Sequence, residues 1–118
     1  MSWRTMIHAV AADKLIANWQ EQLPLKGTGN EKDYHPVVKL FNPIGTGTWL
    51  VTECDEDGLA FGLADIGYPE MGYFDLNEIA EIRLLGGAVR IEQDILFEAD
   101  KPISEYASEA RQTGHIIA

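Results

Sequence analysis

The chain has 118 residues, of which 46% are hydrophobic and 24% are charged, a composition typical of one globular domain and not of a disordered chain. Its formal net charge of −10 argues against direct binding to nucleic-acid backbones or anionic membranes, because both need clustered lysine and arginine. A single cysteine, Cys54, excludes an intramolecular disulfide and a thiolate metal cluster within one chain. No apolar run reaches the ~20 residues that cross a bilayer, so we expect a protein of the reducing cytoplasm without membrane attachment.

The N-terminal third predicts one helix followed by a loop. Ala11, Leu15 and Trp19 recur at a spacing of four, which indicates a helix over residues 6–23 that ends before Pro24. Residues 23–36 contain glycines, prolines and charged residues and show no hydrophobic periodicity. We therefore expect a loop there, and expect it to be the most mobile part of the chain.

The middle of the chain predicts a run of strands. They lie at residues 37–41, 48–53, 59–66 and 70–74, each rich in β-branched or aromatic residues and bounded by turn residues. Strand 48–53 carries apolar residues on both faces, so it is expected to be central, with Trp49, Val51 and Glu53 sharing one face. Gly62 is expected to permit a close approach to the backbone or a bulge.

The last third predicts two helices and two short strands. Asp75 and Glu78 match a capping box that begins a helix over residues 76–82. Residues 88–91 are predicted to be a further strand, and residues 103–110 fall at helical spacing in a helix that Gly114 ends. The apolar tail, residues 115–118, is expected to pack back as a short strand.

Strands grouped between helices at both ends of the chain indicate the α+β class. We expect one domain over residues 1–118, in which residues 1–36 supply the N-terminal helix and loop and residues 37–118 the sheet and the C-terminal helix. The sheet is expected to be mainly antiparallel, to have four or five strands and to carry helices packed on one face.

Charge is distributed unevenly along the chain, because no lysine or arginine lies between Lys39 and Arg83. Such a one-sign segment is either a solubilising surface or a surface that steers a basic partner. From this interval we take seven candidate binding residues: Glu53, Asp55, Glu56, Asp57, Asp65, Glu70 and Asp75.

Two glycine-containing turns are bracketed by three acids, Asp65, Glu70 and Asp75. If these side chains met at one sheet edge, they would form an acid/base pair or a magnesium or calcium site. The alternative is structural: Asp65 satisfies turn amides, Asp75 caps a helix and Glu70 begins a strand. A zinc site from the three histidines with a carboxylate is geometrically possible, but the spacing of these residues does not support it. No catalytic residue, metal ligand or cofactor is assigned.

Four segments follow one another in a recognisable order: KLFNPIGTGTWLVTE, FGLADIGYPEMGYFDLNEI, IEQDILF and ISEYASEA. Over about residues 37–110 the chain resembles the DUF2958 family, a group of small bacterial proteins without an assigned activity. The resemblance implies a genetic context, since such proteins are often encoded on plasmids and integrative elements near anti-restriction or transfer genes. It implies no catalytic residues.

Two functional hypotheses follow. The first is a protein-binding accessory factor of a mobile genetic element, including counter-defence in which acidic residues mimic nucleic acid and dock on a basic nucleic-acid-binding protein. The alternative is a metal-dependent hydrolase that uses clustered carboxylates. The oligomeric state is left open by the sequence.

Overall fold

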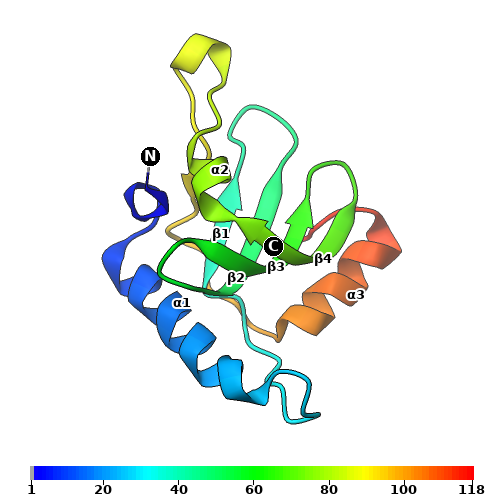
Figure 1. The fold of residues 1–118 in the computed structure, drawn as a ribbon. Helices are drawn as coiled ribbons and strands as arrows, with labels where there is room; N and C mark the ends of the chain where they lie inside the picture. The colour runs from blue at the N-terminus through cyan, green and yellow to red at the C-terminus, as the bar shows by residue number, and fades with distance from the viewer. Residues whose placement is uncertain (1) are drawn as a thin grey trace.

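The computed structural model describes residues 2–118, which form a five-stranded sheet with helices packed on it (Figure 1). The elements in chain order are η1 (Trp3–Thr5), α1 (Ala9–Gln22), η2 (Leu23–Leu25), β1 (Val38–Phe41), β2 (Thr48–Cys54), β3 (Leu59–Asp65), β4 (Pro69–Asp75), α2 (Leu76–Ala80), η3 (Leu85–Gly87), β5 (Glu92–Gln93) and α3 (Ile103–Thr113). The strand order is β4-β3-β2-β1-β5, and every neighbouring pair is antiparallel. The predicted α+β class is confirmed.

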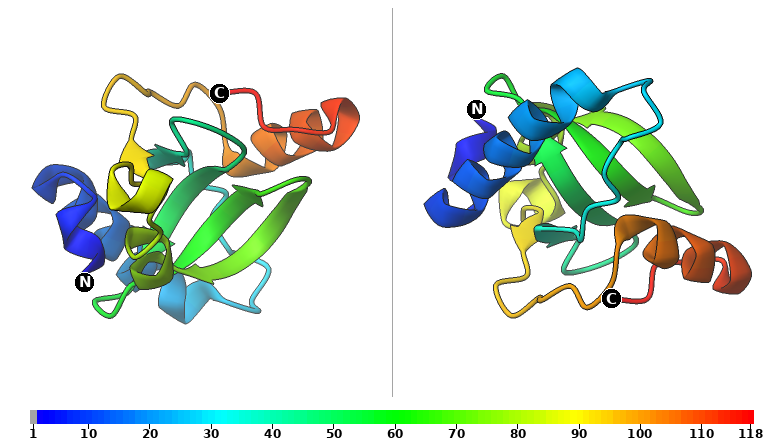
Figure 2. Two further views of the ribbon diagram at one scale, coloured as in Figure 1. Left: turned by 90° about the horizontal axis from the view of Figure 1, so that it is seen from above. Right: turned by 90° about the horizontal axis from the view of Figure 1, so that it is seen from below.

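Helices cover both faces of the sheet, whereas the sequence led us to expect one covered face. Val51 and Trp49 face a core that includes Leu15 of α1 and Leu76 of α2. Leu50 faces the other way, into a second core built with α3. The reason is the central position of β2: its apolar residues alternate over both faces, so both faces need cover. In both views of Figure 2, α1 and α3 lie well apart, with sheet strands between them.

A β-bulge in β2 changes the direction of one side chain. Val51 pairs with Gly62, but Glu53 pairs with Phe61, so Thr52 is an extra residue without a partner of its own in β3. Glu53 therefore lies on the face of Leu50 and not on the face of Val51. The predicted placement of Glu53 beside Trp49 and Val51 is wrong, because regular alternation ends at the bulge.

Helix α1 closes the edge of β2 where β1 stops. The β1–β2 pairing ends at Val38 and Val51, which leaves the last residues of β2 without a strand on that side. The Asn18 side chain of α1 donates a hydrogen bond from Nδ2 to the Thr52 carbonyl oxygen at 2.9 Å. A helix side chain thus takes the place of the next strand.

Several predicted boundaries differ from the structure. The helix expected over residues 6–23 begins at Ala9, and the strand expected at residues 88–91 is replaced by β5, which pairs with β1. The tail at residues 115–118 forms no strand. Asp75 caps α2 and Gly114, at φ 87°, ends α3, as the sequence predicts. No helix within residues 2–118 combines the length and apolar character that crossing a membrane requires.

Candidate functional site

Three of the acidic candidates, Asp55, Glu56 and Asp57, lie in the β2–β3 turn, where Asp55 has a structural role. Its Oδ1 accepts hydrogen bonds from the amides of Asp57 and Leu59, both at 2.9 Å. Gly58 provides the left-handed residue of the turn, at φ 94°. The carboxylate of Asp55 therefore holds the turn closed.

This turn is docked on the N-terminal segment and α2. Glu56 pairs with Arg4 at 2.9 Å, and its carbonyl oxygen accepts a hydrogen bond from Trp3 Nε1 at 3.1 Å. The carbonyl oxygen of Asp57 accepts a hydrogen bond from Asn77 Nδ2 at 2.7 Å. Of the three acids, only Asp57 has an exposed carboxylate with no hydrogen bond or ion pair to another residue within 2–118.

Three further candidates, Asp65, Glu70 and Asp75, do not meet at one edge of the sheet. Asp65 pairs with Pro69 beside the β3–β4 turn, Glu70 pairs with Ala64, and Asp75 lies at the far end of β4 opposite Leu59. Asp65 is buried and accepts turn and tail amides, while Asp75 caps α2. The structural alternative thus describes both residues, and Glu70 stays exposed.

Within residues 2–118, no three histidine, cysteine, aspartate or glutamate side chains are grouped so that they would hold a metal ion. His8, His35 and His115 belong to separate segments of the chain. The carboxylate cluster that the hydrolase hypothesis needs is not formed by Asp65, Glu70 and Asp75.

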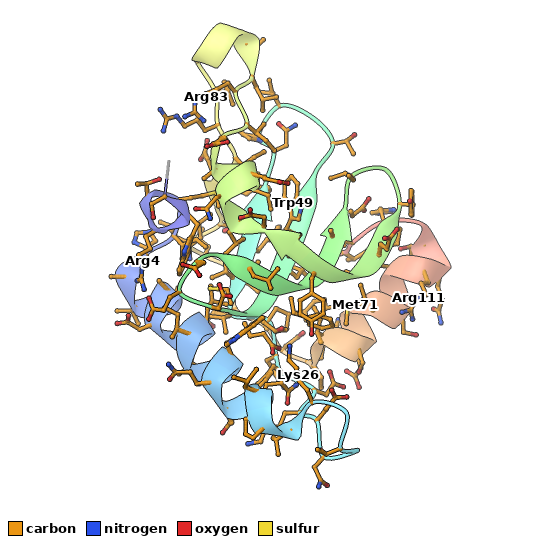
Figure 3. The ribbon with its side chains drawn as sticks, in the orientation of Figure 1. Arg4, Lys26, Trp49, Met71, Arg83 and Arg111 are labelled. Atoms are coloured by element: carbon orange, nitrogen blue, oxygen red, sulfur yellow. The ribbon has the colours of Figure 1, made fainter. Side chains whose placement is uncertain are left out.

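The remaining candidate, Glu53, lines a cavity of about 300 Å³ that we call the Glu53 cavity. Its wall includes Phe61 of β3, Met71 and Tyr73 of β4, and Lys26 of the loop after η2. Figure 3 shows Lys26 and Met71 in the region bounded by the sheet, α1 and α3. The sequence identified Glu53 only as one of a run of acids, and the bulge that turns it into this cavity leaves no signal in the hydrophobic pattern.

Glu53 is a buried carboxyl with few partners, since only 2% of the residue is exposed. Its Oε1 accepts a hydrogen bond from Thr52 Oγ1 at 3.0 Å, and no other residue within 2–118 donates to the carboxyl. Burial raises the pKa of Glu53, while the Thr52 hydrogen bond and the charge of Lys26 act in the opposite direction. A buried carboxyl with a raised pKa that lines a cavity is a candidate functional group.

Lys26 lies between two aromatic rings at this cavity. Its Nζ is 4.4 Å from the centroid of the Trp19 ring and 4.6 Å from that of Tyr73. The same Nζ donates a hydrogen bond to Tyr73 Oη at 2.6 Å. Tyr73 also packs edge-on against Phe61, with ring centroids 5.0 Å apart. The ammonium is therefore held by two π faces and one hydroxyl.

The loop over the cavity is fixed at both ends. The Gln22 side chain makes two hydrogen bonds to the backbone of Lys32, through Nε2 at 2.8 Å and Oε1 at 2.9 Å. Further along, Asp33 accepts hydrogen bonds from the amide and hydroxyl of Ser104 at the start of α3. The loop thus joins α1 to α3 and closes one side of the cavity.

A second surface lies along β4, the strand at the open edge of the sheet. Ile66, Tyr68 and Tyr73 are 70%, 67% and 54% exposed, respectively. With Glu70 they line a shallow pocket of about 300 Å³. No backbone hydrogen bond joins the outer edge of β4 to another segment within residues 2–118.

Comparison with protein-family models identifies the family of the chain. A family model described as a protein of unknown function (DUF2958) matches residues 6–117. The chain belongs to the DUF2958 family. None of the curated proteins matches the chain, and no solved structure does.

The DUF2958 match extends beyond the resemblance over residues 37–110 and includes α1 and the loop that carries Lys26. Both walls of the Glu53 cavity therefore belong to the DUF2958 domain. The family description assigns no activity.

Proposed function

We propose that this DUF2958 protein acts in the cytoplasm by binding another protein, as an accessory factor of a mobile genetic element. The observation that carries the proposal is the outer edge of β4, a seven-residue strand that has no neighbouring strand on that side among residues 2–118. An open strand edge offers a row of backbone donors and acceptors to an extended segment of a partner. Exposed Ile66 and Tyr68 beside it supply apolar contact area.

The charge of the protein indicates a basic partner. At a net charge of −10, a second copy of the chain is repelled, whereas a lysine- or arginine-rich segment is attracted. Glu70 is exposed on β4 itself and places a negative charge on the proposed docking edge. Electrostatic steering of this kind weakens as salt is added.

The partner class we propose is a basic nucleic-acid-binding protein, as counter-defence by nucleic-acid mimicry requires. We place the contact at β4 and not at the acidic turn. Asp55 and Glu56 are engaged within the fold, and Glu53, Asp65 and Asp75 are buried or hold backbone amides. Asp57 and Glu70 are the candidates whose exposed carboxylates are available for mimicry.

The test compares three tagged proteins in pull-downs from host lysate at low and high salt: the wild type, Glu70→Lys and Glu98→Lys. Glu98 is exposed in the segment before α3, away from β4, so its variant is the matched control for a two-unit change in charge. We expect one or more basic proteins to be retained by the wild type and by Glu98→Lys, released by salt and lost with Glu70→Lys. The purified partner should also slow hydrogen exchange of the β4 amides.

Two results would reject the proposal. Equal retention by wild type and Glu70→Lys, with no protection of β4, would place any binding elsewhere on the protein. A concentration-dependent dimer of the purified chain, with β4 protected in the dimer, would show that a second copy and not a basic partner covers the edge.

A further inference from the structure

We propose that the Glu53 cavity is a binding site for an alkylammonium group, and that the side chain of Lys26 occupies it until a ligand replaces it. The cavity shares Met71 and Tyr73 with the pocket along β4, but its carboxyl, Glu53, lies on the central strand β2, and the inference goes beyond the proposed function. The site already holds an ammonium group, it has unused capacity for positive charge, and its occupant is able to leave.

The first step is the geometry around Lys26. Known ammonium sites combine aromatic faces within about 6 Å of the cation with an oxygen acceptor. Here the Trp19 and Tyr73 rings lie 4.4 and 4.6 Å from Nζ, and Tyr73 Oη accepts its hydrogen bond at 2.6 Å. The Lys26 side chain therefore shows that this site accommodates an alkylammonium group.

The second step is the carboxyl of Glu53, which has a single hydrogen bond and shares the cavity with Lys26. Only 2% of Glu53 is exposed, and its carboxyl receives one hydrogen bond, from Thr52. Lys26 is near enough for its charge to lower the pKa of Glu53, yet the two form no ion pair within 4.0 Å. A buried carboxylate is stabilised by a directly paired cation. The Glu53 position thus favours a cation that reaches deeper than Lys26 does.

The other charged groups of the cavity do not fill this role. Lys32 pairs with Glu21 at 3.0 Å, Asp33 binds Ser104, and Glu31 accepts a hydrogen bond from the Gly27 amide. The cavity measures about 300 Å³, far more than the ~30 Å³ that one water occupies in the liquid. Space and negative charge therefore remain beside Lys26.

The third step is the freedom of Lys26 to move. The residue is half-buried and directly precedes Gly27, and Gly29 follows two residues after Gly27; these glycines have left-handed φ angles of 74° and 80°. Both glycines face open space, since nothing lies within 4 Å of an added Cβ. A lysine side chain with a flexible four-carbon stem is able to swing out here without displacing α1.

The ligand chemistry is a primary alkylammonium, which has two sources: a free small amine, or a lysine side chain of a polypeptide. The experiment first asks whether the site exists, with n-butylammonium as probe. Calorimetry and tryptophan fluorescence follow binding to the wild type, to Lys26→Ala and to Lys26→Ala with Glu53→Gln. Removing the internal competitor should tighten binding by about tenfold or more if Lys26 fills the site nine-tenths of the time.

The controls separate the proposed chemistry from nonspecific effects. n-Butanol has the same carbon chain without the charge and should not bind. The double variant Lys26→Ala/Glu98→Gln should bind n-butylammonium with the same affinity as Lys26→Ala, because Glu98 lies outside the cavity. If Lys26→Ala fails to fold, Lys26→Met keeps most of the apolar stem and serves in its place. Glu70→Lys should leave n-butylammonium affinity unchanged, which distinguishes this site from the β4 edge.

Two further probes distinguish the sources. 1,4-Diaminobutane represents a free amine, and acetyl-Gly-Lys-Gly-amide represents a polypeptide lysine. If either probe binds to folded Lys26→Ala and this binding is lost when Glu53→Gln is added, the site is supported. The probe that binds then shows whether the ligand is a free amine or a polypeptide lysine. The proposal is overturned if folded Lys26→Ala or Lys26→Met shows no saturable binding of n-butylammonium, or binds it equally well after Glu53→Gln.

Discussion

The carboxylate of Asp65 ties the C-terminal tail to the β3–β4 turn. Its Oδ2 accepts a hydrogen bond from the Ile116 amide at 3.0 Å, and its Oδ1 accepts one from the Gly67 amide at 3.1 Å. The residue is only 8% exposed, and both bonds are partly buried. One acidic side chain therefore fixes two segments that lie far apart in the sequence.

Removing this carboxylate should destabilise the protein. Asp65→Ala leaves two backbone amides without their acceptor, and we expect the free energy of unfolding to fall by roughly 1–3 kcal/mol. Urea unfolding followed by circular dichroism measures the loss. Glu70→Ala on the same hairpin is the matched control and should change stability by no more than about 0.5 kcal/mol, since its side chain is exposed. Equal losses in the two variants would contradict the role of Asp65.

Much of the fold follows from local sequence signals. β-Branched runs separated by turn residues located β1 to β4, and Asp75 and Gly114 marked the start of α2 and the end of α3 because capping is a local interaction. The position of β5 was missed, since a two-residue strand is defined by its pairing with β1 and has no periodicity of its own.

The candidate site was less accessible to prediction. Glu53 was chosen for its charge, but its place in a cavity depends on the extra residue Thr52, which reverses the alternation of β2. Lys26 and Trp19 come from separate segments that meet only in the folded chain. Long-range contacts of this kind leave no mark in the spacing of a single sequence.

Gly62 illustrates a prediction that the structure confirms. A Cβ on this residue would lie 1.9 Å from the Leu50 carbonyl oxygen, which is the close backbone approach expected from its place in a strand. Gly62→Ala should therefore cost at least about 2 kcal/mol, because strands β2 and β3 have to move apart. Thermal and urea unfolding measure the cost.

Gly45→Ala is the control for this substitution. The nearest atom to its added Cβ is the side-chain nitrogen of Asn42 at 3.4 Å, an ordinary contact, and we expect little change in stability. A Gly62→Ala protein as stable as Gly45→Ala would show that the two strands have more room than the structure gives them.

The Glu53 carboxyl should make stability depend on pH. Burial raises its pKa in the folded state above that of the unfolded chain. The stabilisation from this group is complete below the unfolded pKa, about 4.3, and is lost as the pH rises through the folded pKa. Glu53→Gln is neutral at every pH, so it should be more stable than the wild type above the folded pKa and equal to it near pH 4.

Urea unfolding of wild type, Glu53→Gln and Glu98→Gln over about pH 4–8 tests this sign. Glu98→Gln controls for the loss of one negative charge from an acidic protein. If Glu53→Gln is less stable than the wild type at the alkaline end, the carboxylate is paired in solution and the folded pKa is not raised.

Cys54 should be unreactive while the protein is folded. The residue is fully buried, and burial, with a smaller contribution from the Asp55 charge, raises the pKa of its thiol to about 12. Since the thiolate is the reactive form, a disulfide reagent near pH 8 should modify the wild type only as fast as β2 and β3 open locally. Concentrated guanidinium chloride should release one reactive thiol per chain. Ser108→Cys, exposed on α3, is the positive control and should react at once. Rapid modification of the native wild type would mean that the end of β2 opens readily, and the bulge that directs Glu53 into its cavity would then be too mobile to hold a ligand site.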